Sequence, residues 1–264
     1  MPSDPSTELR RQLAELMQEQ RKLVDGLRGG QAYFQQLARS VWRVQEDERR
    51  RIANELHDGV GHNLAALIHL VANARAALHA AGDPAPPALQ ALERAHAIAE
   101  STLQDTRAMS RLLRPQILDD LGLEAAMHWL ARSSLETRGL DVRLEFRAPR
   151  AALDGDRATL VFRVAQEALA NAARHAGATR VDMRFDGGAD RVRLEVRDDG
   201  RGCDLEAALA RGSAGASAGL GGMRDRARLF DGSLQLDSAP GAGFTLVLEL
   251  PFADAAAGAA AGAA

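Results

Sequence analysis

The chain has 264 residues, of which 46% are hydrophobic and 26% charged, and its formal net charge is −3. This length allows two modest domains with separate cores, and the composition is ordinary for a globular protein. The near-neutral charge argues against broad binding to nucleic acid or to anionic membranes. Cys203 is the only cysteine, which excludes an internal disulfide and a cysteine-based zinc cluster.

The sequence carries no recognisable membrane or export signal. No apolar run reaches the roughly 18 residues that a membrane helix needs. The first ten residues are polar, unlike those of a signal peptide. We therefore expect no membrane span in this sequence and a cytoplasmic location.

Heptad-like spacing marks the first thirty residues. Steps of four and three predict a short coiled coil with one polar seam position, although a single amphipathic helix would give the same pattern. Gly29 and Gly30 are expected to interrupt it. The seam positions are Leu9, Leu13, Leu16, Gln20, Leu23 and Leu27.

A helical hairpin is predicted next. One helix starts near Phe34 and runs to about Ala81, residues 82–87 hold three prolines that cannot continue it, and a second helix covers about 88–113. Alone, the hairpin leaves half of its apolar stripe exposed, so we expect two copies to pair as a homodimeric four-helix bundle. The stripe comprises Ile52, Leu56, Val60, Leu64, Leu67, Val71 and Leu78 on the first helix, and Leu92, Ala99, Leu103, Thr106 and Leu113 on the second.

His57 and Asp58 lie at the edge of that stripe. A neutral imidazole is a competent nucleophile near pH 7, and an adjacent carboxylate can orient it and accept its proton. Gly59 and Gly61 beside them suggest room for an approaching nucleotide or protein and a local bend of the helix.

After a helix that opens at about 121–130, the pattern changes to alternating strands at 142–146, 181–185, 192–196, 234–236 and 244–250. Helices at about 156–175 and 220–230 interleave with them. This order predicts an α/β layer with mixed or antiparallel strands rather than repeated βαβ units. The Ala/Gly tail after Pro251 is expected to be disordered.

Polar groups that suit a nucleotide recur on the helix at 156–175. Glu167, Asn171 and His175 are four residues apart and share one face, with Arg174 alongside. Carboxylate and amide oxygens suit Mg²⁺, and the two basic side chains suit phosphate oxygens. An exposed, salt-bridged helix face is the alternative interpretation.

Glycine-rich segments follow. Asp198 ends a strand, where its carboxylate can accept a hydrogen bond from the amine of adenine, and Gly200 and Gly202 let the backbone approach the base. The Gly/Ser loop 211–219 can serve as a lid, and the helix that starts at Leu220 can attract phosphate. An ordinary Asp-Gly turn and a plain linker are the alternatives.

Together these motifs resemble the two-component sensor histidine kinases, in particular the nitrate-sensor-like subfamily, over residues 41–251. Residues 48–58 (ERRRIANELHD) look like the phosphoacceptor box, and 113–123 (LRPQILDDLGL) like the inter-domain segment. Residues 166–176 (QEALANAARHA) are similar to the asparagine box. Residues 198–202 (DDGRG), 219–224 (GLGGMR) and 238–243 (SAPGAG) are similar to the glycine boxes and the closing hairpin.

The resemblance implies an α plus α/β fold, in which the dimeric hairpin precedes an ATP-binding α/β sandwich of the gyrase type. The expected domains are a signalling helix (1–40), a dimerisation and phosphotransfer domain (41–114), a linker (115–124), the ATP-binding domain (125–252) and the tail (253–264). His57 would accept the γ-phosphoryl group of ATP with Asp58 as base, and Asn171 and Glu167 would hold Mg²⁺. The nucleotide site would comprise Glu167, Asn171, Arg174, His175, Asp198, Gly200, Gly202, Gly219, Leu220, Gly221, Gly222, Met223 and Arg224.

The usual partner of the subfamily is a response regulator with a receiver aspartate and a helix-turn-helix output domain, so DNA contact would belong to that partner. Three residues depart from the subfamily pattern. His62 replaces a glutamine implicated in dephosphorylating the regulator, and it could form an ion pair with Asp58. Phe244 replaces a threonine, interpreted as a packing change, and Cys203 replaces a phenylalanine, interpreted as a small core residue.

Three rival functions use the same ATP-binding fold. A non-catalytic scaffold would bind ATP and a partner without transfer, but intact His57, Asp58, Asn171 and Asp198 argue against it. A serine kinase of the anti-sigma-factor type would not need the hairpin that carries His57. An ATPase of the gyrase kind, with Glu167 activating water, would leave no covalent phosphoprotein.

Overall fold

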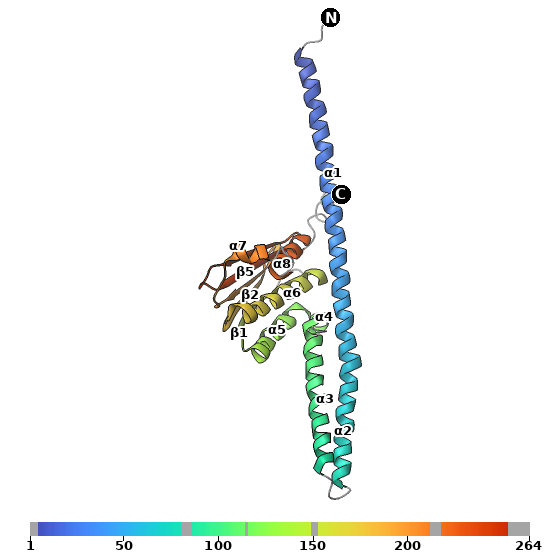
Figure 1. Cartoon of the computed structure of the whole chain (residues 1–264). Coiled ribbons are helices and arrows are strands. Elements are labelled where there is room, and N and C mark those ends of the chain that lie inside the picture. Colours follow the sequence, from blue (N-terminus) through green and yellow to red (C-terminus); the bar gives the residue numbers. More distant parts are fainter. Residues whose placement is uncertain (1–4, 81–85, 114–115, 149–152, 212–217, 253–264) are drawn as a thin grey trace. The chain divides into compact units, whose positions relative to one another are not determined.

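The computed structural model describes residues 5–80, 86–113, 116–148, 153–211 and 218–252 (Figure 1). Contacts divide the chain into two compact units, 1–44 and 45–264, and helix α1 (Pro5–Glu55) runs through the boundary. In these described ranges, none of the helices combines the length and the apolarity that crossing a bilayer requires.

The first unit consists of the N-terminal part of α1. Our prediction that Gly29 and Gly30 interrupt the helix is wrong, because α1 continues through both. A glycine in a helix costs only about 1 kcal/mol relative to alanine, and the leucine, alanine and glutamine residues around the pair favour the helix. Leu16, Leu23 and Leu27 of the expected coiled-coil seam are exposed on the single chain.

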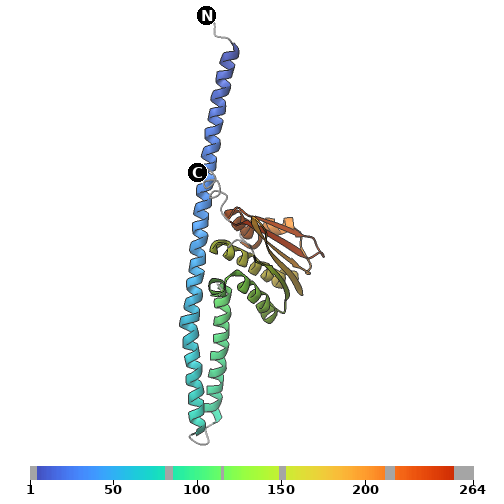
Figure 2. The ribbon, with the colours of Figure 1, turned by 180° about the vertical axis from the view of Figure 1, so that it is seen from behind.

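The predicted hairpin is present in the second unit. Helix α2 (His62–Ala80) and helix α3 (Pro86–Leu113) run antiparallel and side by side in both views (Figures 1 and 2). Ala99, Leu103 and Thr106 of the expected inner face of α3 are buried. The Ser110 hydroxyl donates to the carbonyl oxygen of Ala53 at 2.9 Å, which joins α3 to the end of α1.

A π-helical segment, η1 (Leu56–Gly61), separates α1 from α2. Such a segment adds one residue to a helical turn and is often found at functional sites. The bend suggested by Gly59 and Gly61 therefore takes the form of a widened turn. Gly61 is buried, whereas Gly59 is exposed.

The α/β layer is built on one five-stranded sheet in the order β1-β2-β3-β5-β4. Only β1 and β2 are parallel, and every other neighbouring pair is antiparallel, so the expected mixed order is confirmed. The strands are β1 (Asp141–Arg147), β2 (Arg180–Gly187), β3 (Arg191–Asp198), β4 (Ser233–Ser238) and β5 (Phe244–Pro251).

Helices cover one face of this sheet. They are α5 (Gly122–Arg138), which follows the short α4 (Gln116–Asp120), together with α6 (Gly155–Asn171), α7 (Leu205–Arg211) and α8 (Ala218–Leu229). Alternate residues of β2 and β3 are buried against the helices, and the intervening ones carry charged pairs such as Arg184–Glu145 at 3.0 Å. The core therefore lies between the sheet and its helices. The opposite face of the sheet carries charged side chains that pair across strands.

Helix α6 forms the centre of that core and positions the expected nucleotide residues. The Asp154 carboxylate caps it by accepting the Arg157 backbone N–H at 2.8 Å. The helix buries nine residues, including Leu160, Phe162 and Leu169. It ends in the π-helical turn η2 (Ala172–Ala176), after which Gly177 takes a left-handed conformation (φ 61°) that glycine tolerates best.

Among the described elements, four were not expected from the sequence: the short helices α4 and α7 and the π-helical segments η1 and η2. The predicted Ala/Gly tail, part of the proline-containing turn at 82–87, Pro115 and residues 212–217 of the expected lid lie outside the described residues.

Candidate functional site

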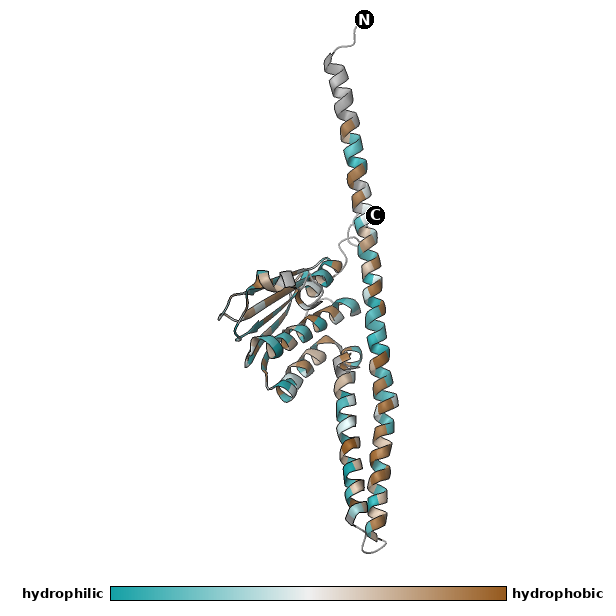
Figure 3. Cartoon of the chain, viewed as in Figure 1, coloured by the Kyte–Doolittle hydropathy of each residue, from teal (hydrophilic) through white to brown (hydrophobic). Residues whose placement is uncertain are grey.

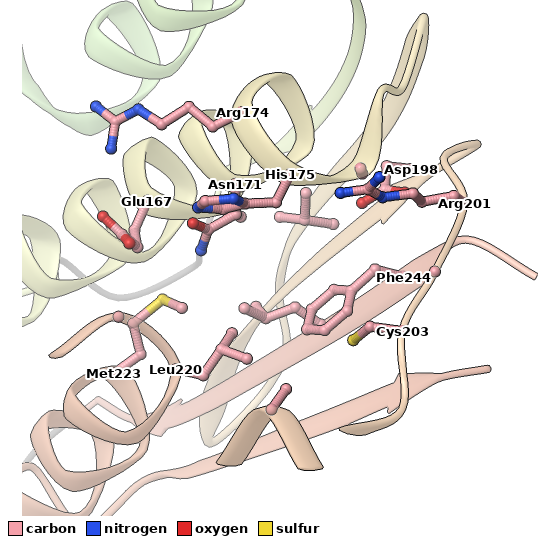
Figure 4. A pocket seen from close by; sticks show the side chains of 17 residues that line it. Glu167, Asn171, Arg174, His175, Asp198, Arg201, Cys203, Leu220, Met223 and Phe244 are labelled. Atoms are coloured by element: carbon pink, nitrogen blue, oxygen red, sulfur yellow. The ribbon is translucent and has the colours of Figure 1, made fainter. Parts of the chain in front are cut away.

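Glu167, Asn171 and His175 form a row along α6 and η2, as the spacing of four predicted. Figure 4 shows the three side chains on the side of the helix that faces Leu220 and Phe244. The Arg174 side chain points away from that row, and its charge lowers the pKa of Arg138 on α5, after the larger effect of burial.

Asp198, at the end of β3, is almost fully buried, with a relative exposure of 9%. The backbone N–H of Gly200 donates to its Oδ1 at 2.9 Å. Burial raises the pKa of this carboxyl, and the backbone N–H groups of Gly200 and Phe244 partly oppose that shift. The Asp198 carboxylate is thus a poorly hydrated hydrogen-bond acceptor that the Gly200 N–H fixes in position.

The neighbouring carboxylate has the opposite character. Asp199 is exposed and accepts the backbone N–H groups of Thr179 at 2.8 Å and Arg180 at 2.9 Å. These bonds lower its pKa to about 2. At pH values above the pKa of an unfolded aspartate, about 3.9, the ionised Asp199 therefore stabilises the folded loop. This stabilisation is lost as the pH falls toward 2. Asp199 thus links the end of β3 to the start of β2, whereas Asp198 lines the cavity.

A cavity of about 560 Å³ lies between α6, the sheet and α8. This volume is within the range of small-molecule sites, roughly 300–1,000 Å³. Nine of the expected nucleotide residues line it: Glu167, Asn171, Arg174, His175, Asp198, Gly202, Gly219, Leu220 and Met223.

Glycines allow the close approaches that shape this cavity. A Cβ atom on Gly219 would come within 2.9 Å of Glu167 Oε1, so the start of α8 lies against the acidic end of the row. A Cβ on Gly243 would lie 2.3 Å from the carbonyl oxygen of Asp198. A side chain at position 219 would displace the Glu167 carboxylate, and one at position 243 would collide with the backbone of β3.

Four expected residues do not line the cavity. Gly200 lies in a neighbouring depression with Asp199 and Gly243. Gly221, Gly222 and Arg224 belong to α8 but lie outside the cavity wall. A helix presents only one face to a cavity, and here Gly219, Leu220 and Met223 occupy that face.

Several lining residues were missed from the sequence. The interpretation of Phe244 as a packing change is incomplete and that of Cys203 as a core residue is wrong, because both line the cavity and both are half-buried. Strand alternation could have identified Phe244, which falls on the same face as the buried Leu246 and Leu248. The other residues missed are Ala168, Ala176, Val196, Arg201, Ala208 and Leu246.

His57 and Asp58 lie on η1 and are exposed to solvent. The suggested ion pair between Asp58 and His62 is absent. Instead, the Nδ1 atom of His62 lies 2.7 Å from the backbone carbonyl oxygen of Asp58 and donates its proton to it. The rings of His57 and His62 meet edge to face with centroids 6.2 Å apart. The exposed Asp58 carboxylate is therefore not paired with His62.

A buried ion pair joins the hairpin region to α6. The Arg163 guanidinium donates to Glu46 Oε2 from two nitrogens at 2.7 and 2.9 Å, and also to the carbonyl oxygen of Leu113. Arg49 contacts the other Glu46 oxygen at 2.7 Å. The side chains of Glu46 and Arg163 are only 4% and 10% exposed, so this fork-shaped contact is largely shielded from water.

The donors at the cavity suit a magnesium-bound nucleotide. Glu167 offers carboxylate and Asn171 amide oxygen, the hard ligands that Mg²⁺ takes together with phosphate oxygens. Within the described ranges, no cluster of three or more His, Cys, Asp or Glu side chains could hold a metal ion. Asp198 offers the acceptor that an exocyclic amine needs.

Comparisons with known proteins agree with this arrangement. Residues 48–118 match the family model described as histidine kinase. Residues 155–254 match the model of histidine kinase-, DNA gyrase B- and HSP90-like ATPases. The sensor histidine kinase MctS of Rhizobium johnstonii is 33% identical over 216 residues, which is 81% of this chain and 45% of that protein. The chain thus spans less than half the length of this curated relative.

Among solved structures, the histidine kinase domain of the blue-light activated kinase from Erythrobacter litoralis is 18% identical, with a TM-score of 0.46 over 78% of this chain and 94% of that one. The ATP-binding domain of PrrB from Mycobacterium tuberculosis is 25% identical, with a TM-score of 0.39 over 48% of this chain and 92% of that one. On the two family models and the curated relative, the chain belongs to the two-component sensor histidine kinases.

Proposed function

We propose that the protein transfers the γ-phosphoryl group of ATP to His57 and then to an aspartate of a response regulator. The observation that carries this proposal is the division of the chemistry between two places. Asp198, Asn171 and Glu167 surround one cavity, while His57 is exposed on a separate helical segment. A site that only bound ATP would not need the second place.

In the proposed reaction, the lone pair of a His57 ring nitrogen forms a bond to the γ-phosphorus. The bond between that phosphorus and the bridging β–γ oxygen breaks, and ADP leaves with its electrons. Asp58 accepts the proton that the imidazole loses. Catalysis of such a transfer rests mainly on in-line positioning and charge neutralisation.

The cavity residues would orient the nucleotide. Asp198 would accept a hydrogen bond from the amine of adenine, and His175 would contact phosphate oxygens. Arg174 was also expected at the phosphates, but its side chain points away from the row in the present structure, so that role would require a different rotamer. Glu167 and Asn171 would hold Mg²⁺, which neutralises phosphate charge when bound.

We also propose the domain division given by the resemblance: a signalling helix (1–40), a phosphotransfer hairpin (41–114), a linker (115–124) and an ATP-binding domain (125–252). The hairpin would pair with a second copy as a four-helix bundle. The partner would be a response regulator with a receiver domain and a helix-turn-helix output domain, and the complex would act in the cytoplasm. Hydrophobic residues recur along α2 and α3 (Figure 3), and Leu67, Leu70, Ile98 and Met109 among them are exposed, which supports the dimer.

The test is incubation with γ-labelled ATP and Mg²⁺, comparing the wild-type chain with His57→Gln and Asn171→Ala. The proposal predicts label that is acid-labile and alkali-stable in the wild type and absent from both variants. His57→Gln should still bind ATP, whereas Asn171→Ala should not bind Mg²⁺-ATP normally. His69→Gln serves as a control, because His69 is exposed elsewhere on α2.

Each rival function predicts a different result. A scaffold would bind ATP without retaining label in any variant. An ATPase would release phosphate and leave the protein unlabelled. A serine kinase would yield acid-stable label on its protein substrate, and this would persist in His57→Gln.

A further inference from the structure

Phe244 opens strand β5 at the rim of the cavity. It pairs with Asp198 on β3 and with Ser238 on β4. Residues 246, 248 and 250 on the same side of β5 are all buried against the helical layer. Alternation along the strand therefore directs the Phe244 ring into the layer, where it lines the cavity.

The ring lies among apolar walls. In Figure 4, Phe244 projects between the α6 row and the side chains of Cys203 and Leu220. Val196 and Leu246 complete this end of the cavity. Among the lining residues, Phe244 is the one with an aromatic hydrocarbon ring. Asp198 and Arg201 lie at this end as well, whereas Glu167 and Asn171 line the other end (Figure 4).

Asp198 and Phe244 are also direct cross-strand partners on β3 and β5, and the backbone N–H of Phe244 is one of the groups that lower the pKa of Asp198 against the larger effect of burial. The polar acceptor and the aromatic ring thus come from one cross-strand pair at the same end of the cavity. A purine base offers both complementary features, an exocyclic amine on its edge and a flat π-face.

We propose that Phe244 binds the base, so that adenine is recognised on its edge by Asp198 and on its face by the Phe244 ring. The inference rests on the proposed ATP site and assigns a second specificity residue within it. A purine offers a larger face than a pyrimidine, so Phe244 should favour purine nucleotides. It should add nothing to the binding of the phosphate chain.

The experiment measures the displacement of a fluorescent ATP analogue by ADP, CDP and inorganic tripolyphosphate. Phe244→Ala should weaken ADP binding by about tenfold, since one stacked base is worth that much or more on alanine substitution. Tripolyphosphate binding should stay within twofold, and the ADP-over-CDP preference should shrink. Phe244→Trp should retain ADP affinity, and Phe244→Leu should fall between. Phe252→Ala is the matched control, because Phe252 is half-buried outside the cavity.

Cys203 provides an independent readout as the only thiol of the chain. Because it lines the same end of the cavity, ADP should slow its alkylation in the wild type. At one fixed subsaturating ADP concentration, protection should be weaker in Phe244→Ala. Tripolyphosphate should protect poorly in both proteins.

The possible results separate the two claims. If Phe244→Ala and Phe244→Leu bind ADP as tightly as the wild type, the role of Phe244 is refuted and the ATP site stands. If Phe244→Ala weakens ADP and tripolyphosphate equally, the residue is merely structural. If the wild type binds no nucleotide, the proposed function and this inference both fail.

Discussion

The hairpin and the α/β layer solve the burial of apolar surface differently. Helix α2 has no buried residue on the single chain, whereas α6 buries nine. Val60, Leu67, Leu70, Ile98 and Met109 are all exposed on the hairpin. The described part of the α/β layer therefore buries its core within one chain, whereas the described part of the hairpin leaves apolar side chains exposed, which favours the proposed pairing with a second copy.

The chemistry follows the same division. Asp198 is nearly buried beside a cavity, where poor hydration strengthens its hydrogen bonds. His57 and Asp58 are exposed. In the proposed reaction, His57 meets first a nucleotide and then a receiver aspartate and has to be accessible, whereas Asp198, the proposed base-reading group, benefits from shielding. On the proposed function, the nucleotide-binding residues and the phosphoacceptor therefore lie in different regions of the chain.

The contact between the two regions should give the largest stability effect. Arg163→Leu leaves the buried Glu46 carboxylate without its main partner, which should destabilise the second unit by about 3 kcal/mol. This is the lower end of the usual range because Arg49 still contacts Glu46. Arg184→Leu removes an exposed, solvent-screened pair with Glu145 and should change stability far less than Arg163→Leu does. Denaturant unfolding of both variants measures the two losses of stability. Equal losses would contradict the importance of the buried Glu46–Arg163 pair.

Neutralising the buried Asp198 carboxylate should cost nearly as much free energy, in this case of nucleotide binding. Asp198→Asn should weaken ADP binding by about 100-fold, because a charge-assisted hydrogen bond in a shielded site is lost. In the wild type, protonation of Asp198 should reduce affinity as the pH falls. Because its pKa is raised, the decline should begin above the usual range of an aspartate. Calorimetric titration across pH would show this slope in the wild type and not in Asp198→Asn.

Placing charge on the exposed stripe should break the hairpin's association and leave the α/β layer intact. Leu67→Glu should weaken the dimer by roughly 30-fold, since a charge replaces an apolar contact. Asn73→Glu places the same charge on another side of α2 and should have little effect. Sedimentation velocity measures both. A Leu67→Glu protein that remains as dimeric as the wild type would contradict the proposed four-helix bundle.

The smallest effect is expected next to the phosphoacceptor. Gly61→Leu should slow phosphoryl transfer to His57 by about tenfold, because it crowds the widened turn and displaces the imidazole. ADP affinity should not change, since Gly61 lies outside the cavity. The rate of His57 labelling and the ADP affinity are measured in Gly61→Leu and in the wild type, and their ratio is compared. Unchanged transfer would show that the glycine is not needed for access.

Much of the fold follows from short-range patterns in the sequence. Alternating apolar residues located all five strands to within a few residues, as at Val192–Val196 within β3. The spacing of four correctly placed Glu167, Asn171 and His175 on one side of a helix. Both patterns depend only on residues close together in the sequence, so they do not require knowledge of the tertiary contacts.

The features that the sequence did not reveal depend on contacts between distant residues. The pairing of Glu46 with Arg163 requires knowing which helix meets which, and neither residue stands out locally. The π-helical segment η1 begins within a continuous apolar stripe, where ordinary helical spacing was assumed. Phe244 reaches the cavity because β5 lies between β3 and β4, an order that hydrophobic spacing does not specify.

In the proposed reaction, a nucleotide bound beside Asp198 supplies the phosphoryl group to His57. The most direct measurement is mass spectrometry, at neutral to alkaline pH, of the peptide that contains His57 after reaction with ATP and Mg²⁺. We expect one added phosphoryl group on His57, lost on brief acid treatment and strongly reduced in Asp198→Asn. An unmodified His57 in a protein that binds ATP, or phosphorylation at another residue, would contradict it.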